Sequence, residues 1–386
     1  MRIVVLGGDG FCGWPTALKL AMSYHDVLII DNLSRRKIDS DLSSNSLTDI
    51  ASIEDRINTA NYYIADQHEG GYIDFFHCDI AKEYYLFQQK IEKWKPDAIV
   101  HFAEQRAAPY SMISEKERRY TVDNNITTTH NVLNAIVDTD PNIHLVHLGT
   151  MGVYGYSKDF GDIPEGYLNM KVNSTGKDVD VLYPTQPGSV YHMTKSLDQI
   201  LFQFYNKNWG LKITDLHQGI VWGTQTMETM LHENLINRFD YDGIYGTVLN
   251  RFISQAATGN DITVYGTGGQ QRAFIHIRDT ANCVKLAIEN PSKENKVRIF
   301  NQVSEVRSVK ELAYIVAEQD EKRIQFLDNP RKELKENELS VKNEGLKSLG
   351  FNPITLSEGL IQDVKFIAQQ MKENLNPANI LTSPRW

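Results

Sequence analysis

The chain has 386 residues and a formal net charge of -9 at pH 7. This length predicts one large α/β domain and a smaller second one, because a single core rarely serves so long a chain. The acidic charge argues against nucleic acid and anionic membranes as partners. Three cysteines without a C-x-x-C pair, and a first apolar run at residue 2 with no leader-like stretch before it, favour a cytoplasmic protein with reduced thiols.

The first expected element is a buried parallel strand over residues 2–6, which are apolar and mostly β-branched. It runs into Gly7, Gly10 and Gly13, spaced as G-x-x-G-x-x-G, and then into helical periodicity over residues 16–22. The glycines admit a pyrophosphate close to the backbone, and the new helix points free N–H groups at it. Strand, glycine turn and helix in this order therefore predict a dinucleotide site.

A second apolar run, over residues 26–30, ends at Asp31. An acidic side chain at this offset accepts hydrogen bonds from the adenosine ribose hydroxyls and repels a 2′-phosphate. Arg35 and Arg36 favour the opposite choice, since arginines after the second strand often hold that phosphate; the alternative for both is a solvated turn. We weigh Asp31 more heavily and predict NAD.

Further strands are expected over residues 73–78, 98–102, 143–148 and 211–216, with a helix that opens at Asn125. Parallel strands place their carboxyl ends, and hence their ligands, at one edge of the sheet. The pattern predicts a Rossmann-type doubly wound α/β fold with a smaller C-terminal α/β substrate domain. We place the first domain at residues 1–216, with an insertion at about 33–70 and an excursion at about 158–183, and the second, interleaved with it, at 217–386.

Tyr191 and Lys195 stand four residues apart in the segment S-V-Y-H-M-T-K-S-L-D. On a helix this spacing puts both side chains on one face. A phenol with a pKa of about 10 is a poor base at neutral pH, but a nearby ammonium lowers that pKa. The pair is then suited to take a proton from a sugar hydroxyl. The spacing alone also fits an ordinary solvated helix.

Together these motifs resemble the extended short-chain dehydrogenase/reductases that act on nucleotide sugars, the NAD-dependent epimerase/dehydratase family. Within that family, segments 7–14, 103–112, 149–155 and 247–252 resemble a branch that combines UDP-glucose with sulfite. The resemblance implies NAD as cofactor, UDP-glucose and sulfite as substrates, and a homodimer. The motifs that carry it are Gly7-x-x-Gly10-x-x-Gly13, Asp31, Asp79-Ile80, Asn125, Thr150, Tyr191-x-x-x-Lys195 and Arg272-x-Phe274-x-His276-x-x-Asp279.

The resemblance also implies a mechanism. Tyr191 removes the C4 hydroxyl proton while NAD oxidises that carbon, Thr150 orients the hydroxyl, and Lys195 tunes Tyr191 and holds the nicotinamide ribose. The C4 ketone acidifies the C5 hydrogen, so water leaves across C5 and C6. Sulfite adds at C6, and C4 is reduced again.

Met151 and Gly152 stand where related 4,6-dehydratases carry an Asp-Glu pair that serves the elimination. We interpret the change as a pocket altered to admit sulfite, against an alternative of neutral drift. His192 is the candidate for the missing acid or for a sulfite contact, and plain helix packing is its alternative. Arg106 is a second candidate for anion binding, against an ordinary surface arginine.

Residues 224–240 could form a lid over the sugar, although core packing is the simpler interpretation of Met227 and Met230.

The resemblance assigns two further sets of residues, one to the cofactor and one to the substrate. The cofactor set is Gly7, Gly10, Phe11, Cys12, Gly13, Asp31, Asn32, Arg35, Arg36, Asp79, Ile80, Phe102, Ala103, Asn125, Tyr191, Lys195, Gln218 and Val221. The substrate set is Arg106, Thr150, Met151, Gln218, Thr247, Asn250, Arg251, Val264, Tyr265, Arg272 and Arg331.

Two other functions remain open at this point. A UDP-sugar 4-epimerase or 4,6-dehydratase shares Thr150, Tyr191 and Lys195. A NAD-binding regulator without turnover would have lost these residues, yet all three are present. No metal site is expected, because the histidines are scattered and lack ligand spacing.

Overall fold

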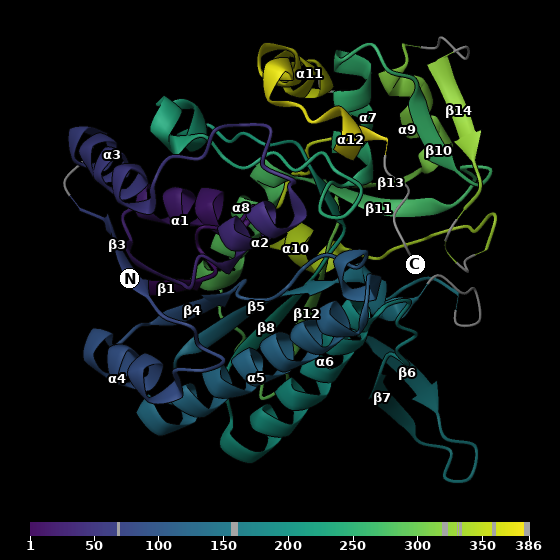
Figure 1. Cartoon of the computed structure of the whole chain (residues 1–386). Coiled ribbons are helices and arrows are strands. Elements are labelled where there is room, and N and C mark those ends of the chain that lie inside the picture. Colours follow the sequence, from purple (N-terminus) through teal and green to yellow (C-terminus); the bar gives the residue numbers. More distant parts are fainter. Residues whose placement is uncertain are drawn as a thin grey trace.

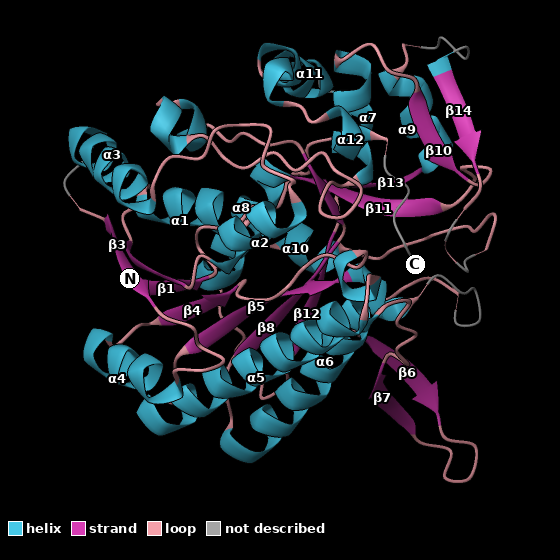
Figure 2. Ribbon diagram, viewed as in Figure 1, coloured by secondary structure: helices cyan, strands magenta, loops and turns pink. Residues whose placement is uncertain are grey.

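A seven-stranded parallel sheet forms the centre of the chain (Figures 1 and 2). The computed structural model describes residues 1–67, 70–155, 161–318, 323–329, 331, 334–356 and 360–381. The strand order is β12-β8-β5-β4-β1-β2-β3, and this sheet confirms the predicted doubly wound fold. Its strands are β1 (Arg2–Leu6), β2 (Asp26–Asp31), β3 (Tyr72–His77), β4 (Ala98–His101), β5 (His144–Thr150), β8 (Ile213–Gln218) and β12 (Arg298–Gln302).

Helices cover both faces of the sheet because its strands are apolar on both sides. Along β1, Ile3 and Val5 belong to one buried cluster, and Val4 and Leu6 to another. The first cluster includes side chains of α1 (Gly13–Ala21), α3 (Ile53–Gln67) and α8 (Ile277–Glu289). The second includes side chains of α4 (Tyr84–Trp94), α5 (Glu115–Thr139) and α6 (Val190–Trp209). Figure 1 shows α5 and α6 side by side.

The C-terminal part builds a smaller α/β unit beside the carboxyl edge of the sheet (Figure 1). The chain does not divide cleanly at residue 217, because β12 and α8 return to the large sheet and its core. The unit has a three-stranded sheet of β9 (Ile220–Trp222), β11 (Gln271–His276) and β13 (Glu305–Ser308), and a strand pair of β10 (Ile262–Tyr265) and β14 (Ile324–Leu327). Its helices are α7 (Val248–Ala257), α9 (Val309–Val316), α11 (Leu360–Gln370) and α12 (Pro377–Ile380). The short helix α10 (Glu344–Ser348) packs on α8.

Three expectations about local structure change. Helix α5 begins at Glu115, behind the N-cap Ser114, so Asn125 lies in its interior rather than at its start. The expected insertion contains α2 (Ser34–Leu42) and α3. The expected excursion contains the antiparallel hairpin of β6 (Tyr167–Lys171) and β7 (Asp178–Leu182), which projects from the body in Figure 1; its first three residues, 158–160, lie outside the described residues.

None of residues 224–240, the expected lid, lines the cavity at the carboxyl edge of the sheet. The short 3-10 helices of this segment, Glu228–Met230 and Glu233–Leu235, pack against α1 and α3. The indole N–H of Trp14 donates to the Leu235 carbonyl at 2.9 Å. Met227 and Met230 are 67% and 55% exposed, so the core-packing interpretation is wrong for both.

A buried ion cluster holds α2 and α3, which lie between β2 and β3 in the chain, against the turn after β1. Asp9, in the glycine turn, accepts hydrogen bonds from Arg36 Nε at 2.6 Å and from Arg56 Nη1 at 2.6 Å. The Asp9 and Arg56 side chains are 3% and 1% exposed. Burial alone would raise the pKa of Asp9, but the two guanidiniums outweigh it and hold that pKa below its ordinary value. The cluster ties α2 and α3 to the turn after β1.

We expect Asp9→Asn to lower the free energy of unfolding by about 3 kcal/mol, because it removes the carboxylate that pairs with the buried guanidinium of Arg56 and the half-buried one of Arg36. The folded pKa of Asp9 is depressed, so this stability is present above the unfolded value, near 3.8, and is lost as pH falls through the folded pKa. Urea unfolding at several pH values tests both statements. Glu115→Gln, which breaks an exposed pair with Arg119, serves as the control and should change little. Equal losses in the two variants would contradict the expectation.

Candidate active site

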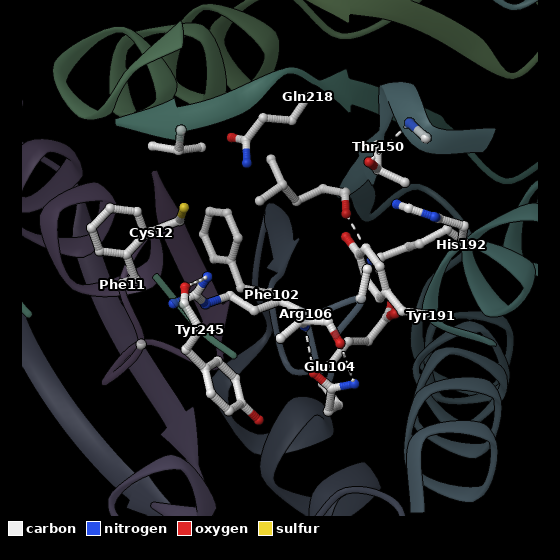
Figure 3. Close-up of a pocket in the computed structure, with 18 of the residues that line it drawn as sticks. Phe11, Cys12, Phe102, Glu104, Arg106, Thr150, Tyr191, His192, Gln218 and Tyr245 are labelled. Carbon is white, nitrogen blue, oxygen red and sulfur yellow. Dashed lines mark hydrogen bonds and ion pairs between the residues drawn. The ribbon is translucent and has the colours of Figure 1, made fainter. Parts of the chain in front are cut away.

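A cavity of about 840 Å³ lies at the carboxyl edge of the sheet, between the two parts of the chain. Its walls come from the turns after β1, β2, β4, β5 and β8, from the start of α6, and from residues 244–248. Figure 3 shows side chains from these elements pointing into it. The cavity is therefore where parallel-sheet folds place their ligands.

The glycine turn closely approaches the chain after β4. Gly7 has φ +76°, and a Cβ there would lie 2.8 Å from the backbone of Phe102 and Ala103. Only glycine allows both the conformation and this approach. Phe11 and Cys12 follow in the cavity wall, and burial raises the pKa of the Cys12 thiol to about 11, so this thiol is neutral.

Asp31 lies at the end of β2 in the same wall. Its carboxylate accepts the backbone N–H groups of Asp9 at 2.9 Å and Leu33 at 2.7 Å. Burial, followed by the negative charge of Asp9, raises the pKa of Asp31 to about 6. Asn32, Asp79 and Ile80 also line the cavity, so the ends of β2 and β3 face one space.

The two arginines after β2 are both engaged inside the protein. Arg36 binds Asp9 with two nitrogens and does not line the cavity. Arg35 pairs with Asp39 and, at 2.9 Å, with Asp240, and its guanidinium stacks 3.6 Å over the ring of Tyr245. Both guanidiniums are paired with carboxylates of the chain itself, and Arg36 is better described as a structural residue.

Tyr191 and Lys195 lie one turn apart on α6, both facing the cavity. Ser189 caps the helix, and Ser111 accepts the Tyr191 backbone N–H at 3.1 Å. The expectation of a lowered phenol pKa is wrong for this structure. Burial raises the pKa of Tyr191 more than Lys195 and the hydrogen bond with Thr150 lower it.

The Lys195 ammonium has partners that the sequence did not reveal. Its Nζ lies 3.0 Å from Glu104 Oε1, 3.0 Å from His147 Nε2 and 2.7 Å from the Leu148 carbonyl. Glu104 belongs to segment 103–112, whose only signal was family resemblance. Glu104, His147 and Asp198 also have the spacing of a metal site among the described residues, but the ammonium already places a cation beside the first two.

The segment after Thr150 is shaped by His192. The Gly152 N–H donates to Thr150 Oγ1 at 3.1 Å, and a Cβ on Gly152 would lie 2.3 Å from the ring of His192. The ring therefore occupies the space of a side chain at position 152. Burial, followed by the charges of Arg331 and Arg272, lowers the pKa of His192 to about 4, so the imidazole is neutral at pH 7.

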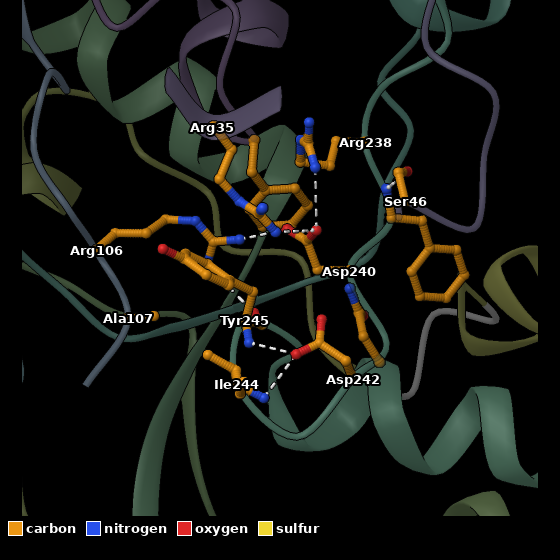
Figure 4. A network of polar contacts seen from close by, with 12 residues as sticks. Arg35, Ser46, Arg106, Ala107, Arg238, Asp240, Asp242, Ile244 and Tyr245 are labelled. Carbon is orange, nitrogen blue, oxygen red and sulfur yellow. Dashed lines mark hydrogen bonds and ion pairs between the residues drawn. The ribbon is translucent and has the colours of Figure 1, made fainter. Parts of the chain in front are cut away.

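Arg106 belongs to a charged network at the opposite wall (Figure 4). It pairs with Asp240 and stacks 5.2 Å over the ring of Phe11. Within this network the three guanidiniums of Arg35, Arg106 and Arg238 face the two carboxylates of Asp39 and Asp240. The excess is positive, and Arg106 is the member that is 30% exposed. This wall is suited to an anion.

Besides Arg36, five expected contact residues do not line the cavity. Asn125 binds the backbone of Gln105, with its oxygen accepting the N–H at 2.8 Å and its amide donating to the carbonyl at 3.0 Å, so it shapes the turn after β4. Asn250 binds Gly223. Arg251, Val264 and Tyr265 are not among the residues that line the cavity, whereas Thr247 and Val248 are. The expected residues that do line it include Phe102, Ala103, Arg106, Thr150, Met151, Gln218, Val221, Thr247, Arg272 and Arg331.

Other wall residues were not expected at all. Tyr120 comes from the interior of α5, Gln186 from the chain before α6, and Ile244 and Tyr245 from the C-terminal part. The sequence offers no motif for them, because only the packing of distant elements brings them together.

The comparisons with known proteins agree with this geometry. Residues 3–301 match the NAD dependent epimerase/dehydratase family, and the chain belongs to that family. Within it, the chain belongs with the UDP-sulfoquinovose synthases. It is 44% identical to the chloroplastic enzyme of Spinacia oleracea, over 100% of this chain and 79% of the relative. It is 41% identical to the enzyme of Sulfolobus acidocaldarius, over 96% of this chain and 92% of the relative.

Solved structures with lower identity share the fold. The UDP-glucose 4-epimerase of Thermotoga maritima has a TM-score of 0.69 at 20% identity, over 96% of this chain and 100% of its own. The dTDP-glucose 4,6-dehydratase of Bacillus anthracis has a TM-score of 0.68 at 17% identity, over 98% and 99%. No described helix is long and apolar enough to cross a membrane.

NAD is the cofactor of this family, and the cavity fits it. The close approach at Gly7 leaves backbone space for a pyrophosphate, and Asp31 offers a carboxylate to a ribose. In addition, Gln218 Oε1 is buried in this wall and has no hydrogen-bond partner among the described residues. A bound nucleotide provides such a partner.

We expect Asp31→Asn to weaken NAD binding about tenfold or more, because hydrogen bonds to a charged acceptor contribute about 1.5–3 kcal/mol. Since the pKa of Asp31 is about 6, NAD affinity of the parent should also fall as pH drops below 6, whereas that of the variant should not. Calorimetric titration after removal of NAD measures both effects. Asp41→Asn, an exposed position on α2, is the control. Unchanged affinity in Asp31→Asn would contradict the assignment.

Proposed function

We propose that the chain is a UDP-sulfoquinovose synthase, which converts UDP-glucose and sulfite to UDP-6-sulfo-6-deoxyglucose and water. The observation that carries the proposal is that Met151 and Gly152 follow Thr150, where related 4,6-dehydratases carry an Asp-Glu pair. His192 fills the space of a side chain at Gly152 and leaves a neutral imidazole near two arginines. The identity to two such synthases over nearly the whole chain supports it.

The sugar is oxidised at C4 by the chemistry that NAD supplies when bound. Thr150 hydrogen bonds Tyr191 and positions the C4 hydroxyl between them. Tyr191 takes the hydroxyl proton, and it returns that proton when C4 is reduced at the end of the cycle. Lys195 favours the phenolate by its positive charge, so both proton transfers use one residue on one face of α6.

The C4 ketone acidifies the C5 hydrogen. The C5–H and C6–O bonds then break, water leaves, and a C5–C6 double bond forms. The sulfur lone pair of hydrogen sulfite attacks C6 and C5 regains a proton, which gives R–OH + HSO₃⁻ → R–SO₃⁻ + H₂O overall. The neutral imidazole of His192 donates a hydrogen bond to the leaving hydroxyl, which departs as water with the proton lost from C5. The positive charges of Arg106, Arg272 and Arg331 face the cavity where the anions bind.

The substrate carries a diphosphate, and arginine forks bind phosphate oxygens in pairs. Arg272, near the start of β11, and Arg331 both line the cavity on the side of the C-terminal part. Thr247 and Gln218 complete the wall between them and the glycine turn. We assign the diphosphate of UDP-glucose to these arginines and the sugar to the space beside Thr150.

We expect purified protein to form a nucleotide sugar heavier by sulfite minus water only when sulfite is present. Mass spectrometry of the nucleotide pool detects it. Tyr191→Phe should abolish product, because it removes the base while keeping the ring. Epimerisation of UDP-glucose, or a 4-keto-6-deoxy sugar formed without sulfite, would instead support the alternative, a 4-epimerase or 4,6-dehydratase. Absence of any turnover would favour a non-catalytic NAD-binding protein.

We also propose a homodimer through α5 and α6. On α6, Met193, Leu197, Ile200 and Phe204 follow one another at spacings of four, three and four, and are 38%, 39%, 59% and 53% exposed. This spacing places them on one outer face. A second copy would cover this apolar stripe with its own α5 and α6, which forms a four-helix interface.

We expect Ile200→Asp to shift the protein toward the monomer, because it places a charge at the centre of that stripe. Light scattering after size-exclusion chromatography measures the mass. Tyr85→Asp changes an aromatic residue that is 76% exposed on α4 and should leave the mass unchanged. A monomeric parent, or a dimeric Ile200→Asp protein, would contradict the proposal.

We place this reaction in the cytoplasm. The three cysteines are free and buried, and the formal charge of -9 gives no basis for binding an anionic surface. The assignment is independent of the chemistry above.

A further inference from the structure

Three polar atoms form a buried triangle behind the active-site tyrosine. Glu104 Oε1, Lys195 Nζ and His147 Nε2 lie 3.0 Å from one another along all three edges. The three side chains are 2%, 4% and 0% exposed. Figure 3 shows Glu104 below Tyr191 at the cavity wall. Buried charges this close control one another's protonation.

The hydrogen bonds of His147 allow two states of the triangle. Its Nδ1 lies 2.8 Å from Asp215 Oδ1, and a carboxylate there holds the Nδ1 proton. If Nε2 also carries a proton, it donates to Glu104, and Lys195 keeps one N–H for the cavity after binding Glu104 and the Leu148 carbonyl. If Nε2 is bare, it accepts the third N–H of Lys195, and all three donors are consumed inside the chain.

The surroundings favour the first state near neutral pH. Although burial and Lys195 lower the pKa of His147, Asp215 and Glu104 outweigh them and raise it to about 9. Burial would raise the pKa of Glu104, but Lys195 and His147 hold it low. Burial lowers the pKa of Lys195, and Glu104, followed by Tyr191 and Asp198, raises it.

Other ionisable groups face the triangle from each neighbouring element. His101 on β4 lies 3.6 Å from Glu104 Oε1, and burial lowers its pKa to about 3, so it is neutral. Asp198 on α6 lies 3.7 Å from His147 Nε2, and burial raises its pKa well above the ordinary value. His217 lies 2.9 Å from the far oxygen of Asp215. Arg106 acts on Tyr191 from the cavity side. None of these groups replaces the carboxylate of Glu104 beside Lys195.

We propose that Glu104 is a positioning residue that holds the Lys195 ammonium beside Tyr191 and, with His147, sets the pH range over which the pair works. It does not touch the reacting atoms. The proposal rests on the function proposed above, but the triangle itself depends only on the geometry. The proposal assigns a role to Glu104, a residue of segment 103–112, whose only signal in the sequence was family resemblance.

The test compares Glu104→Gln and Glu104→Asp with the parent. Removing the negative charge favours the phenolate of Tyr191 and disfavours the cations of His147 and Lys195. Both limbs of the pH profile of kcat should therefore move to lower pH, by about one unit for Glu104→Gln, the effect of a nearby charge on a buried group. Glu104→Asp keeps the charge at a longer distance, so its limbs should lie between those of Glu104→Gln and the parent.

Glu165→Gln is the matched control. Glu165 is a half-buried carboxylate that accepts N–H groups of Asn301 and Gly345 outside the cavity wall. The same chemical change there should leave both limbs in place, even if stability falls. A Glu104→Gln protein that loses kcat without any shift of the limbs would reduce Glu104 to a structural residue and overturn the proposal.

A second measurement does not need turnover. Ultraviolet titration of the phenolate, taken as the difference between each protein and its Tyr191→Phe counterpart, gives the ionisation midpoint of Tyr191. We expect that midpoint to fall in Glu104→Gln and, by less, in Glu104→Asp, which also serves if Glu104→Gln does not fold. An unchanged or raised midpoint overturns the proposal. If no variant makes sulfonated product, the proposed function fails, while this titration still decides the role of Glu104.

Discussion

Charged side chains at the carboxyl edge of the sheet are buried, and they can remain so because opposite charges lie in contact with them. Three such groups surround the cavity, centred on the carboxylates of Asp9, Asp240 and Glu104. Each joins elements that are distant in the chain: Asp9 joins the glycine turn to α2 and α3, Asp240 joins the C-terminal part to α2, and Glu104 joins the turn after β4 to α6. The pairing of buried opposite charges therefore determines both the shape and the charge of the cavity.

The features that the sequence predicted are those whose causes are local. An apolar run followed by glycines at fixed spacing specifies strand, turn and helix within about 20 residues, and residues 2–22 fold in this way. The rule that parallel strands end at one edge then places Asp31, Thr150 and Gln218 in one cavity without knowledge of their contacts. The helical spacing of Tyr191 and Lys195 needs no more information than the backbone period.

The features that it missed depend on partners far away in the chain. Arg35 was weighed as a phosphate contact or as part of a solvated turn; it lines the cavity, and its guanidinium pairs with Asp240, 205 residues later. Asn125 matched a family motif, yet its amide is used up by the backbone of Gln105. The pKa of Tyr191 depends on whether burial or the ammonium of Lys195 prevails, and burial cannot be read from a spacing. A motif identifies which residue types are present, whereas their tasks depend on the charges that packing brings beside them.

The contact between Gly152 and His192 shows, in the proposed chemistry, how the task of a residue depends on the neighbours that pack beside it. The two residues lie on different elements, and any side chain at 152 would displace the imidazole ring, so position 152 cannot gain a side chain while the ring of His192 stays in place. A carboxylate at 152 would partly neutralise Arg272 and Arg331 and repel an incoming anion. A neutral imidazole in the same space adds no negative charge beside these two arginines and still offers a ring N–H to the leaving hydroxyl. On the proposed function, loss of the acid pair and admission of sulfite are therefore one physical change.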